Sequence, residues 1–187
     1  MNVVNNQQEK LTAILSVAEE RISNWNEFTG KKLRIAYADS LVLNDLTSFF
    51  EKRYFNYDAG NHGGDFMYMN GETPLKFAVY VDCALVGYVI GRIDFDNNAI
   101  EVFYTEPSNF YNSKGLMPWI AFINNILCWV KLAINELDDK GLNKIIMTNP
   151  PTESIEALRE MGYEFVRDYN KSTNAVILHI NLVDNLN

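Results

Sequence analysis

One stretch constrains the fold more than any other: an apolar segment, a polar loop and a long apolar helix follow one another between Ala99 and Gly141. The first part, Ala99 to Glu106, is rich in β-branched and aromatic residues, which predicts a buried strand. Gly115 marks the point where the loop becomes a helix, and Pro118 suits a first helical position because its missing N–H would have no partner there. The helix is expected to run to Lys140, with Gly141 just past its end.

A strand that leads through a glycine-bearing loop into a helix N-terminus is one way to bind an anion. Free backbone N–H groups and the helix dipole both favour negative charge at that point. The same order is also an ordinary connection between a strand and a helix, and one glycine does not separate the two interpretations. The residues around Gly115 therefore leave open whether the loop holds a phosphate.

Length and charge narrow the class of protein. The 187 residues fit one domain with an added element, and a hydrophobic share of 48% is enough for a sizeable core. The formal net charge of -8 argues against a general nucleic-acid binder and is compatible with a cationic substrate or a basic partner. The polar start of the chain predicts no signal peptide, and asparagines and a lysine within Trp119 to Leu137 make that segment a poor membrane span. We expect a cytoplasmic protein.

The remaining elements follow from periodicity and turn residues. Apolar residues recur at three- and four-residue steps in the first segment, which predicts a helix over Asn5 to Phe28. Gly87 and Gly91 fall inside one strand and predict a bulge or a close backbone approach. The expected apolar face of the first helix is Leu11, Ile14, Leu15, Ala18, Ile22 and Trp25. Further strands are expected at 33–38, 66–69, 75–81, 85–95, 144–148, 163–168 and 175–182, with helices at 40–55 and, capped by Thr152, 152–161.

This order of elements predicts an α/β (α+β) fold. An antiparallel meander comes first, and β-α-β units then add strands beside it, with helices on both faces. Cys83 and Cys128 lie in apolar runs and are expected to be reduced core residues. His62 and His179 have no partner at metal-ligand spacing, so we expect no metal site.

The order of elements, together with the segments FAVYVDCALVGYVIGRIDF and SIEALREMGYEFV, resembles the GNAT superfamily of acyl-CoA N-acyltransferases over Leu33 to Leu182. The resemblance implies a mixed central sheet of about six to seven strands with helices on both faces. It makes residues 31–187 the acyltransferase domain and residues 1–30 an N-terminal helical extension.

The resemblance also implies acetyl-CoA as the cofactor. In this family the strand before the long helix separates from its neighbour and pairs with the pantetheine arm, and the next loop binds the pyrophosphate with the pattern Arg/Gln-x-x-Gly-x-Gly/Ala. Gly115 matches that pattern, whereas Asn112 and Met117 depart from it. A family asparagine near the coenzyme corresponds to Asn149. The coenzyme-binding residues implied in this way are Val102, Phe103, Tyr104, Thr105, Asn112, Lys114, Gly115, Leu116, Met117 and Asn149.

The same comparison implies catalytic candidates. Glu101 lies eleven residues before Asn112, where histone-type members hold a catalytic glutamate. Burial between apolar neighbours would suit a general base, although a solvent-facing glutamate on an alternating strand has the same sequence pattern. The family tyrosine that protonates the leaving thiolate corresponds to Leu158, which has no proton to give, so Tyr104 or Tyr163 would have to replace it unless both are core aromatics. Glu106 and Asp94 are expected to be solvated and are weaker candidates for the base.

Two functions remain open at this point. The first is an acetyl-CoA-dependent N-acetyltransferase that acts by direct attack of a small amine, a lysine side chain or an N-terminal amine, with Glu101 as the general base. The second is a catalytically degenerate protein of the same fold that serves as an acidic binding or regulatory module, because Leu158 and the altered loop depart from the family. We expect neither a nucleic acid nor a membrane as a partner, and the first helix allows a homodimer.

Overall fold

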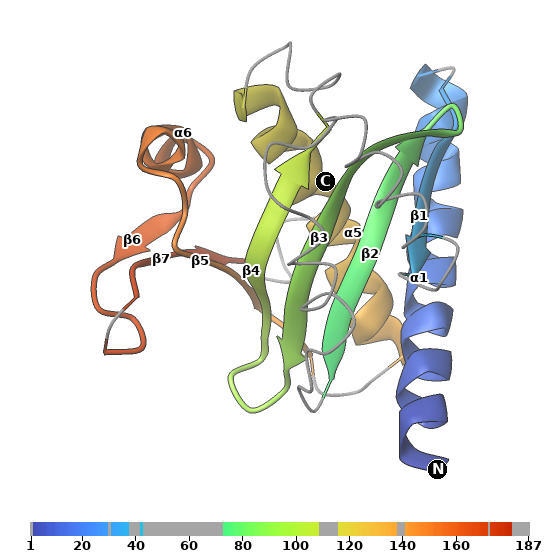
Figure 1. The fold of residues 1–187 in the computed structure, drawn as a ribbon, viewed down its shortest axis with the longest axis horizontal. Coiled ribbons are helices and arrows are strands. Elements are labelled where there is room, and N and C mark those ends of the chain that lie inside the picture. The colour runs from blue at the N-terminus through green and yellow to red at the C-terminus, as the bar shows by residue number, and fades with distance from the viewer. Residues whose placement is uncertain are drawn as a thin grey trace.

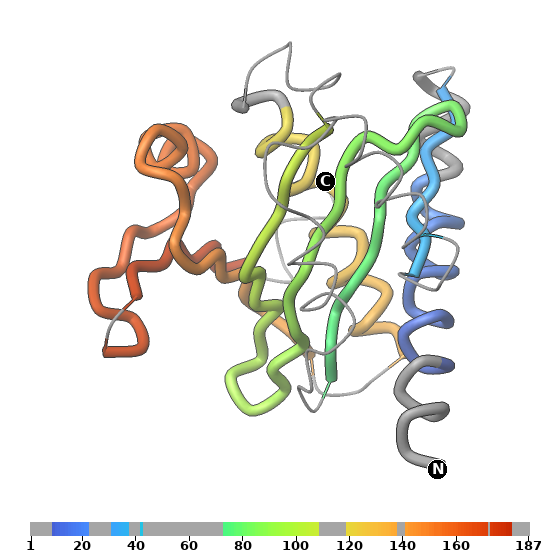
Figure 2. Tube along the Cα trace, in the orientation of Figure 1, coloured from blue at the N-terminus to red at the C-terminus, as the bar shows by residue number. Residues whose placement is uncertain are grey.

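The computed structural model describes residues 2–29, 31–37, 42, 73–108, 116–137, 141–171 and 173–180 (Figure 2). The predicted loop residues Asn112, Lys114 and Gly115 lie outside these ranges, as do the predicted strand at 66–69 and all of the predicted helix at 40–55 except Val42.

Within the described residues, seven strands form one mixed sheet, in agreement with the six to seven strands that the resemblance predicted (Figure 1). Their order across the sheet is β1-β2-β3-β4-β5-β7-β6. Every neighbouring pair is antiparallel except β4 and β5, which are parallel. The strands are β1 (Leu33–Tyr37), β2 (Pro74–Val81), β3 (Ala84–Asp94), β4 (Ala99–Pro107), β5 (Lys144–Thr148), β6 (Glu164–Val166) and β7 (Ala175–His179).

Two long helices cover one face of the sheet. They are α1 (Asn2–Thr29) and α5 (Leu116–Leu137), which contact each other, while α1 also contacts β1 (Figure 1). The apolar face predicted for α1 is buried within the chain, so it needs no second subunit to cover it. The described members of that face are Leu11, Ile14, Leu15, Ala18 and Ile22, each at most 3% exposed.

The opposite face of the sheet carries a second apolar cluster. Val42, which is helical and buried, packs there against side chains of β2 and β3 such as Ala78 and Tyr88. Val42 is the one described residue of the predicted helix at 40–55, and it lies on this face. A short helix, α6 (Ile155–Glu160), follows the 3-10 turn η1 (Thr152–Ser154) after β5.

The packing of α5 explains its apolar sequence. By length and composition the segment Trp119–Leu137 could cross a membrane, with a mean hydropathy of 1.3. Trp119, Ile123 and Leu127 are nevertheless fully buried in the cluster that α5 shares with the sheet and α1. A core helix meets the same length and composition criteria, so this feature is weak evidence for a membrane span.

Some local predictions were wrong. Cys83 is exposed rather than buried, because it lies in the tight turn between β2 and β3, where Asp82 and Cys83 both adopt positive φ. Thr152 lies inside η1 and does not cap α6, which begins without a side-chain cap. Pro118 is the third residue of α5 rather than the first, still within the turn whose N–H groups lack helical partners.

Lys131 is a buried cation on α5, and its exposed fraction is only 1%. Its Nζ has no hydrogen-bond partner among the described residues, and burial lowers its pKa. Because the folded state disfavours the ammonium form, the unfolded chain binds that proton more tightly. The free energy of unfolding should therefore rise with pH from the lowered pKa up to the ordinary value of about 10.5.

We expect Lys131→Met to raise the melting temperature at neutral pH, because it keeps the volume and removes the buried charge. The gain over the wild type should shrink as the pH approaches the ordinary lysine pKa. Thermal melts of both proteins across this pH range measure the effect. A variant that melts lower than the wild type at neutral pH would show that the ammonium is stabilised where it lies.

Candidate functional site

A bulge in β4 shapes the centre of the sheet. Ile90 of β3 lies opposite Tyr104, but the next residue, Gly91, lies opposite Val102, so Phe103 is an extra residue in β4. A Cβ on Gly91 would lie 2.2 Å from the backbone oxygen of Glu101, which only glycine avoids. The predicted bulge with close backbone approach is therefore confirmed at Gly91.

Beyond this bulge, β4 and β5 separate. Their parallel pairing covers only Ala99–Val102 with Lys144–Met147, and β5 ends one residue later at Thr148. The Thr148 hydroxyl donates to the Val102 carbonyl oxygen at 3.3 Å, at the point of separation. Figure 1 shows β5, β7 and β6 extending away from β4. From Phe103 onward, β4 has no strand partner on its β5 side within the part of the chain that the structure describes.

A cavity of about 110 Å³ occupies this gap. Its wall is mostly apolar and is completed by residues from β5, α5, η1 and α6. The structure brings five of the predicted coenzyme residues into the lining: Val102, Phe103, Tyr104, Thr105 and Asn149. The other lining residues are Ile120, Met147, Thr148, Pro150, Pro151, Ser154 and Leu158.

The N-terminal turn of α5 borders the same cavity, since Ile120 is both the fifth residue of α5 and part of the lining. Leu116 and Met117 are the first two residues of that helix. The first four N–H groups of a helix have no partner within it, and they carry the positive end of the helix dipole. The geometry thus provides donors for an anion beside the gap.

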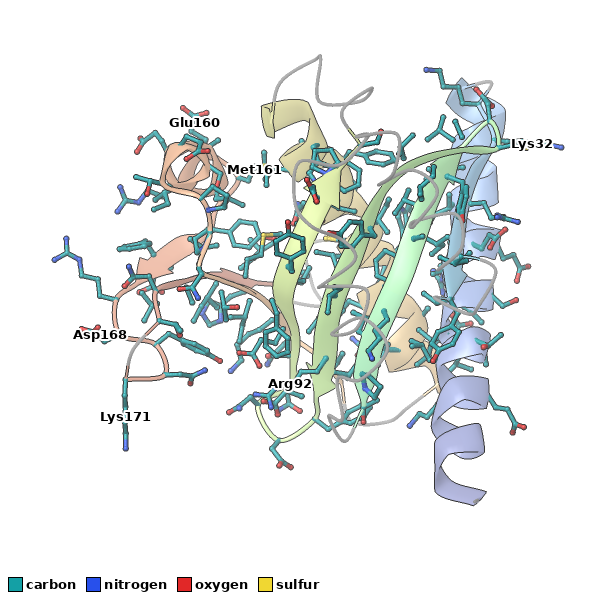
Figure 3. The ribbon with its side chains drawn as sticks, in the orientation of Figure 1. Lys32, Arg92, Glu160, Met161, Asp168 and Lys171 are labelled. Atoms are coloured by element: carbon teal, nitrogen blue, oxygen red, sulfur yellow. The ribbon has the colours of Figure 1, made fainter. Side chains whose placement is uncertain are left out.

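Glu101 is buried, with 1% of its surface exposed, so the solvent-facing alternative is wrong. Arg92 Nε donates to its Oε2 at 2.6 Å, which compensates the buried negative charge. Figure 3 shows Arg92 near the turn between β3 and β4, far from the labelled end of α6. Val102, the next residue, belongs to the core on the α5 side, and Glu101 does not line the cavity. Its role as a base stays a prediction.

Glu106 is buried rather than solvated, contrary to expectation, and is only 8% exposed. The hydroxyls of Tyr88 and Tyr104 both lie within hydrogen-bond distance of its Oε2, at 3.1 Å and 3.3 Å. Burial, together with Tyr104 and Glu106, raises the pKa of Tyr88. The sequence analysis treated Glu106 as solvated because carboxylates at strand ends usually are. The available signal was Tyr104, which precedes it by two residues and therefore shares its face of the strand.

The structure also separates the two tyrosines predicted as proton donors. Tyr163 is 3% exposed, its hydroxyl lies 2.6 Å from Asn124 Oδ1, and burial raises its pKa. It does not line the cavity, whereas Tyr104 does. Leu158, at the family's tyrosine position, is fully buried and lines the cavity as an apolar wall. Of these two tyrosines, Tyr104 is thus the one that lines the gap, and its role as a proton donor stays a prediction.

No protein-family model and no curated sequence matches the chain. Solved acetyltransferase structures do match its fold. The ribosomal L7/L12 alpha-N-protein acetyltransferase RimL has a TM-score of 0.53 at 12% identity over 79% of this chain and 93% of its own. The dodecameric spermidine N-acetyltransferase from Vibrio cholerae has 0.51 at 14%, with the same coverages. An acetyltransferase from Streptococcus agalactiae has 0.51 at 8%, over 81% of this chain and 99% of its own. The chain therefore shares the fold of these acetyltransferases, which is the fold that the resemblance predicted.

Proposed function

We propose that the protein is an N-acetyltransferase that transfers an acetyl group from acetyl-CoA to an amine. The observation that carries this proposal is the separation of β4 from β5 beyond Val102, with a cavity in the gap. The matched structures support it, since they include a spermidine N-acetyltransferase and a ribosomal L7/L12 alpha-N-protein acetyltransferase.

The residues around the gap fit the chemistry of acetyl-CoA. A pantetheine arm carries two amides on a flexible chain, and the β5 side of β4 from Phe103 onward offers backbone groups to pair with them. Apolar walls from Ile120 and Leu158 would exclude water from the thioester that acetyl-CoA supplies. The backbone N–H groups of Leu116 and Met117 at the start of α5 would hold the pyrophosphate. We propose that Asn112, Lys114 and Gly115 complete that contact.

The charge of the chain supports a cationic acceptor. At a formal net charge of -8, the protein attracts ammonium groups at long range. We therefore propose a small amine, a lysine side chain or an N-terminal amine as the acceptor, in the cytoplasm. A homodimer stays a prediction. The apolar face of α1 does not support it, because that face is already covered within the chain.

Leu158 supports the second candidate function, a protein that keeps the fold and the acetyl-CoA site without transfer. It lines the cavity and cannot give a proton to a leaving thiolate. Acetyl-CoA would then act as a bound ligand that stabilises the folded protein.

The test is a panel of polyamines, lysine-containing peptides and peptides with free N-termini, incubated with acetyl-CoA and the purified protein. We expect mass spectrometry to detect one acetylated product class, at a rate that rises with pH as the amine loses its proton. Heat-denatured protein is the control for spontaneous acetylation. Binding of acetyl-CoA without any acetylated product would reject transfer and leave the binding module.

A further inference from the structure

Glu106 forms a buried cluster with two tyrosines beside the cavity. Both hydroxyls contact the same oxygen, Oε2, at 3.1 Å for Tyr88 and 3.3 Å for Tyr104. The two rings lie 5.7 Å apart between centroids, and Tyr88 is only 2% exposed. Because Tyr88 lies directly opposite Glu106 in the β3–β4 pairing, the backbone holds the cluster together. A buried carboxylate that is held by two hydroxyls beside a cavity is a candidate functional group.

Tyr104 connects this cluster to the cavity. It lines the gap between β4 and β5, and it also packs on the sheet face opposite α5. Glu106 and Tyr88 do not line the cavity. Tyr104 is therefore the member of this cluster that borders the gap, and its hydroxyl contacts the Glu106 carboxylate.

We propose that Tyr104 is a catalytic residue and that Glu106 acts through it as the proton acceptor for the amine substrate, an inference that rests on the proposed function. An ionised carboxylate has no hydrogen to donate, so the Tyr104 hydroxyl is the donor in its contact with Glu106. A phenol oxygen can accept as well as donate, so it can take a hydrogen bond from an ammonium group. Tyr104 thus relays a proton without having to become a stable phenolate.

The reaction moves two amine protons, forms one C–N bond and breaks one C–S bond. One ammonium proton moves to Tyr104 Oη as the hydroxyl proton of Tyr104 moves to Glu106 Oε2. The amine lone pair then forms the C–N bond to the thioester carbonyl carbon, the C–S bond breaks with its electron pair on sulfur, and the second amine proton passes to that thiolate. Glu106 finally returns its proton through Tyr104 to solvent.

Glu101, the other buried glutamate of β4, is the alternative proton acceptor. Glu101 is ion-paired with Arg92 and does not line the cavity. The two residues can be compared with the same isosteric change, because each variant keeps the side-chain shape and removes one carboxylate. Tyr88 and Tyr104 are titratable groups hydrogen-bonded to Glu106, and Lys76 of β2 lies opposite Ile90 on the same face of the sheet.

The first experiment compares the pH dependence of the acetylation rate in the wild type, Glu106→Gln, Tyr104→Phe and Glu101→Gln. We expect Glu106→Gln and Tyr104→Phe to lower the rate roughly 10²–10⁴-fold and to lose the part of the decline at acidic pH that protonation of Glu106 causes, while the dependence on protonation of the amine itself remains. Glu101→Gln should keep that decline. The opposite pattern, with the decline lost only in Glu101→Gln, would overturn the relay and make Glu101 the base.

The second experiment needs no acetyl-CoA and no activity. Isotope labels on the tyrosine ring carbon that bears the hydroxyl allow the Tyr104 signal to be followed by NMR as the pH is lowered. We expect the signal to shift as Glu106 takes up a proton, and the shift to disappear in Glu106→Gln but to remain in the matched control Tyr88→Phe. A Tyr104 signal that does not respond in the wild type would overturn the relay even in an active enzyme. A wild type with no acetylation activity would refute the proposed function, and the relay with it.

Discussion

Acetyl-CoA binding is expected to be lost when Thr148 is replaced by phenylalanine. Thr148 lines the cavity and lies at the point where β4 and β5 separate, with its hydroxyl 3.3 Å from the Val102 carbonyl oxygen. An aromatic ring there would take up most of a cavity of about 110 Å³. We expect calorimetric titration to show at least a roughly tenfold loss of affinity, about 1.4 kcal/mol.

The matched control for this change is Thr148→Val. Valine has nearly the shape of threonine and removes only the hydroxyl, so its affinity for acetyl-CoA should stay within about threefold of the wild type, less than 1 kcal/mol. Circular dichroism would establish that both variants are folded. A folded Thr148→Phe variant with unchanged affinity would mean that acetyl-CoA binds elsewhere.

Gly91→Ala is expected to lower the free energy of unfolding by about 3 kcal/mol, the upper end for overpacking in a core. Its Cβ would lie 2.2 Å from the backbone oxygen of Glu101, and 3.1 Å from the Val102 Cα. Both contacts are backbone atoms of β4, so no side chain can turn away to make room. Since β4 bulges at this point, the variant should also bind acetyl-CoA more weakly.

A suitable control is Gly141→Ala, measured by the same urea denaturation. Gly141 has a positive φ of +51°, but no atom of the described residues lies within 4 Å of its Cβ position. The cost there should be only about 1 kcal/mol, from the backbone conformation alone. Equal losses at the two positions would show that the close approach at Gly91 is relieved without cost.

The strands of the sheet could be predicted from the sequence because the patterns that indicate a strand or a turn are local. Turn residues and β-branched runs placed β5 at 144–148, the residues the structure shows, and Gly91 indicated the close approach that the bulge requires. The periodicity of α1 identified its buried face for the same reason. Each of these features depends on neighbours within a few residues.

The candidate site was less predictable because it depends on partners far apart in the chain. The burial of Glu106 depends on Tyr88, eighteen residues earlier, and Glu101 is paired by Arg92 of the neighbouring strand. Leu158 and Ile120 reach the cavity from α6 and α5, which only the tertiary structure brings to β4. A glutamate on a strand has the same sequence pattern whether it is solvated, ion-paired or held by two tyrosines.

Calorimetric titration of acetyl-CoA into the wild-type protein tests the central claim most directly, because the claim is that the gap between β4 and β5 is the acetyl-CoA site. The account predicts saturable binding of one acetyl-CoA per chain, with a melting temperature that rises with ligand concentration as binding to the folded state requires. A folded protein that shows no binding heat and no change in melting temperature at millimolar acetyl-CoA would contradict it.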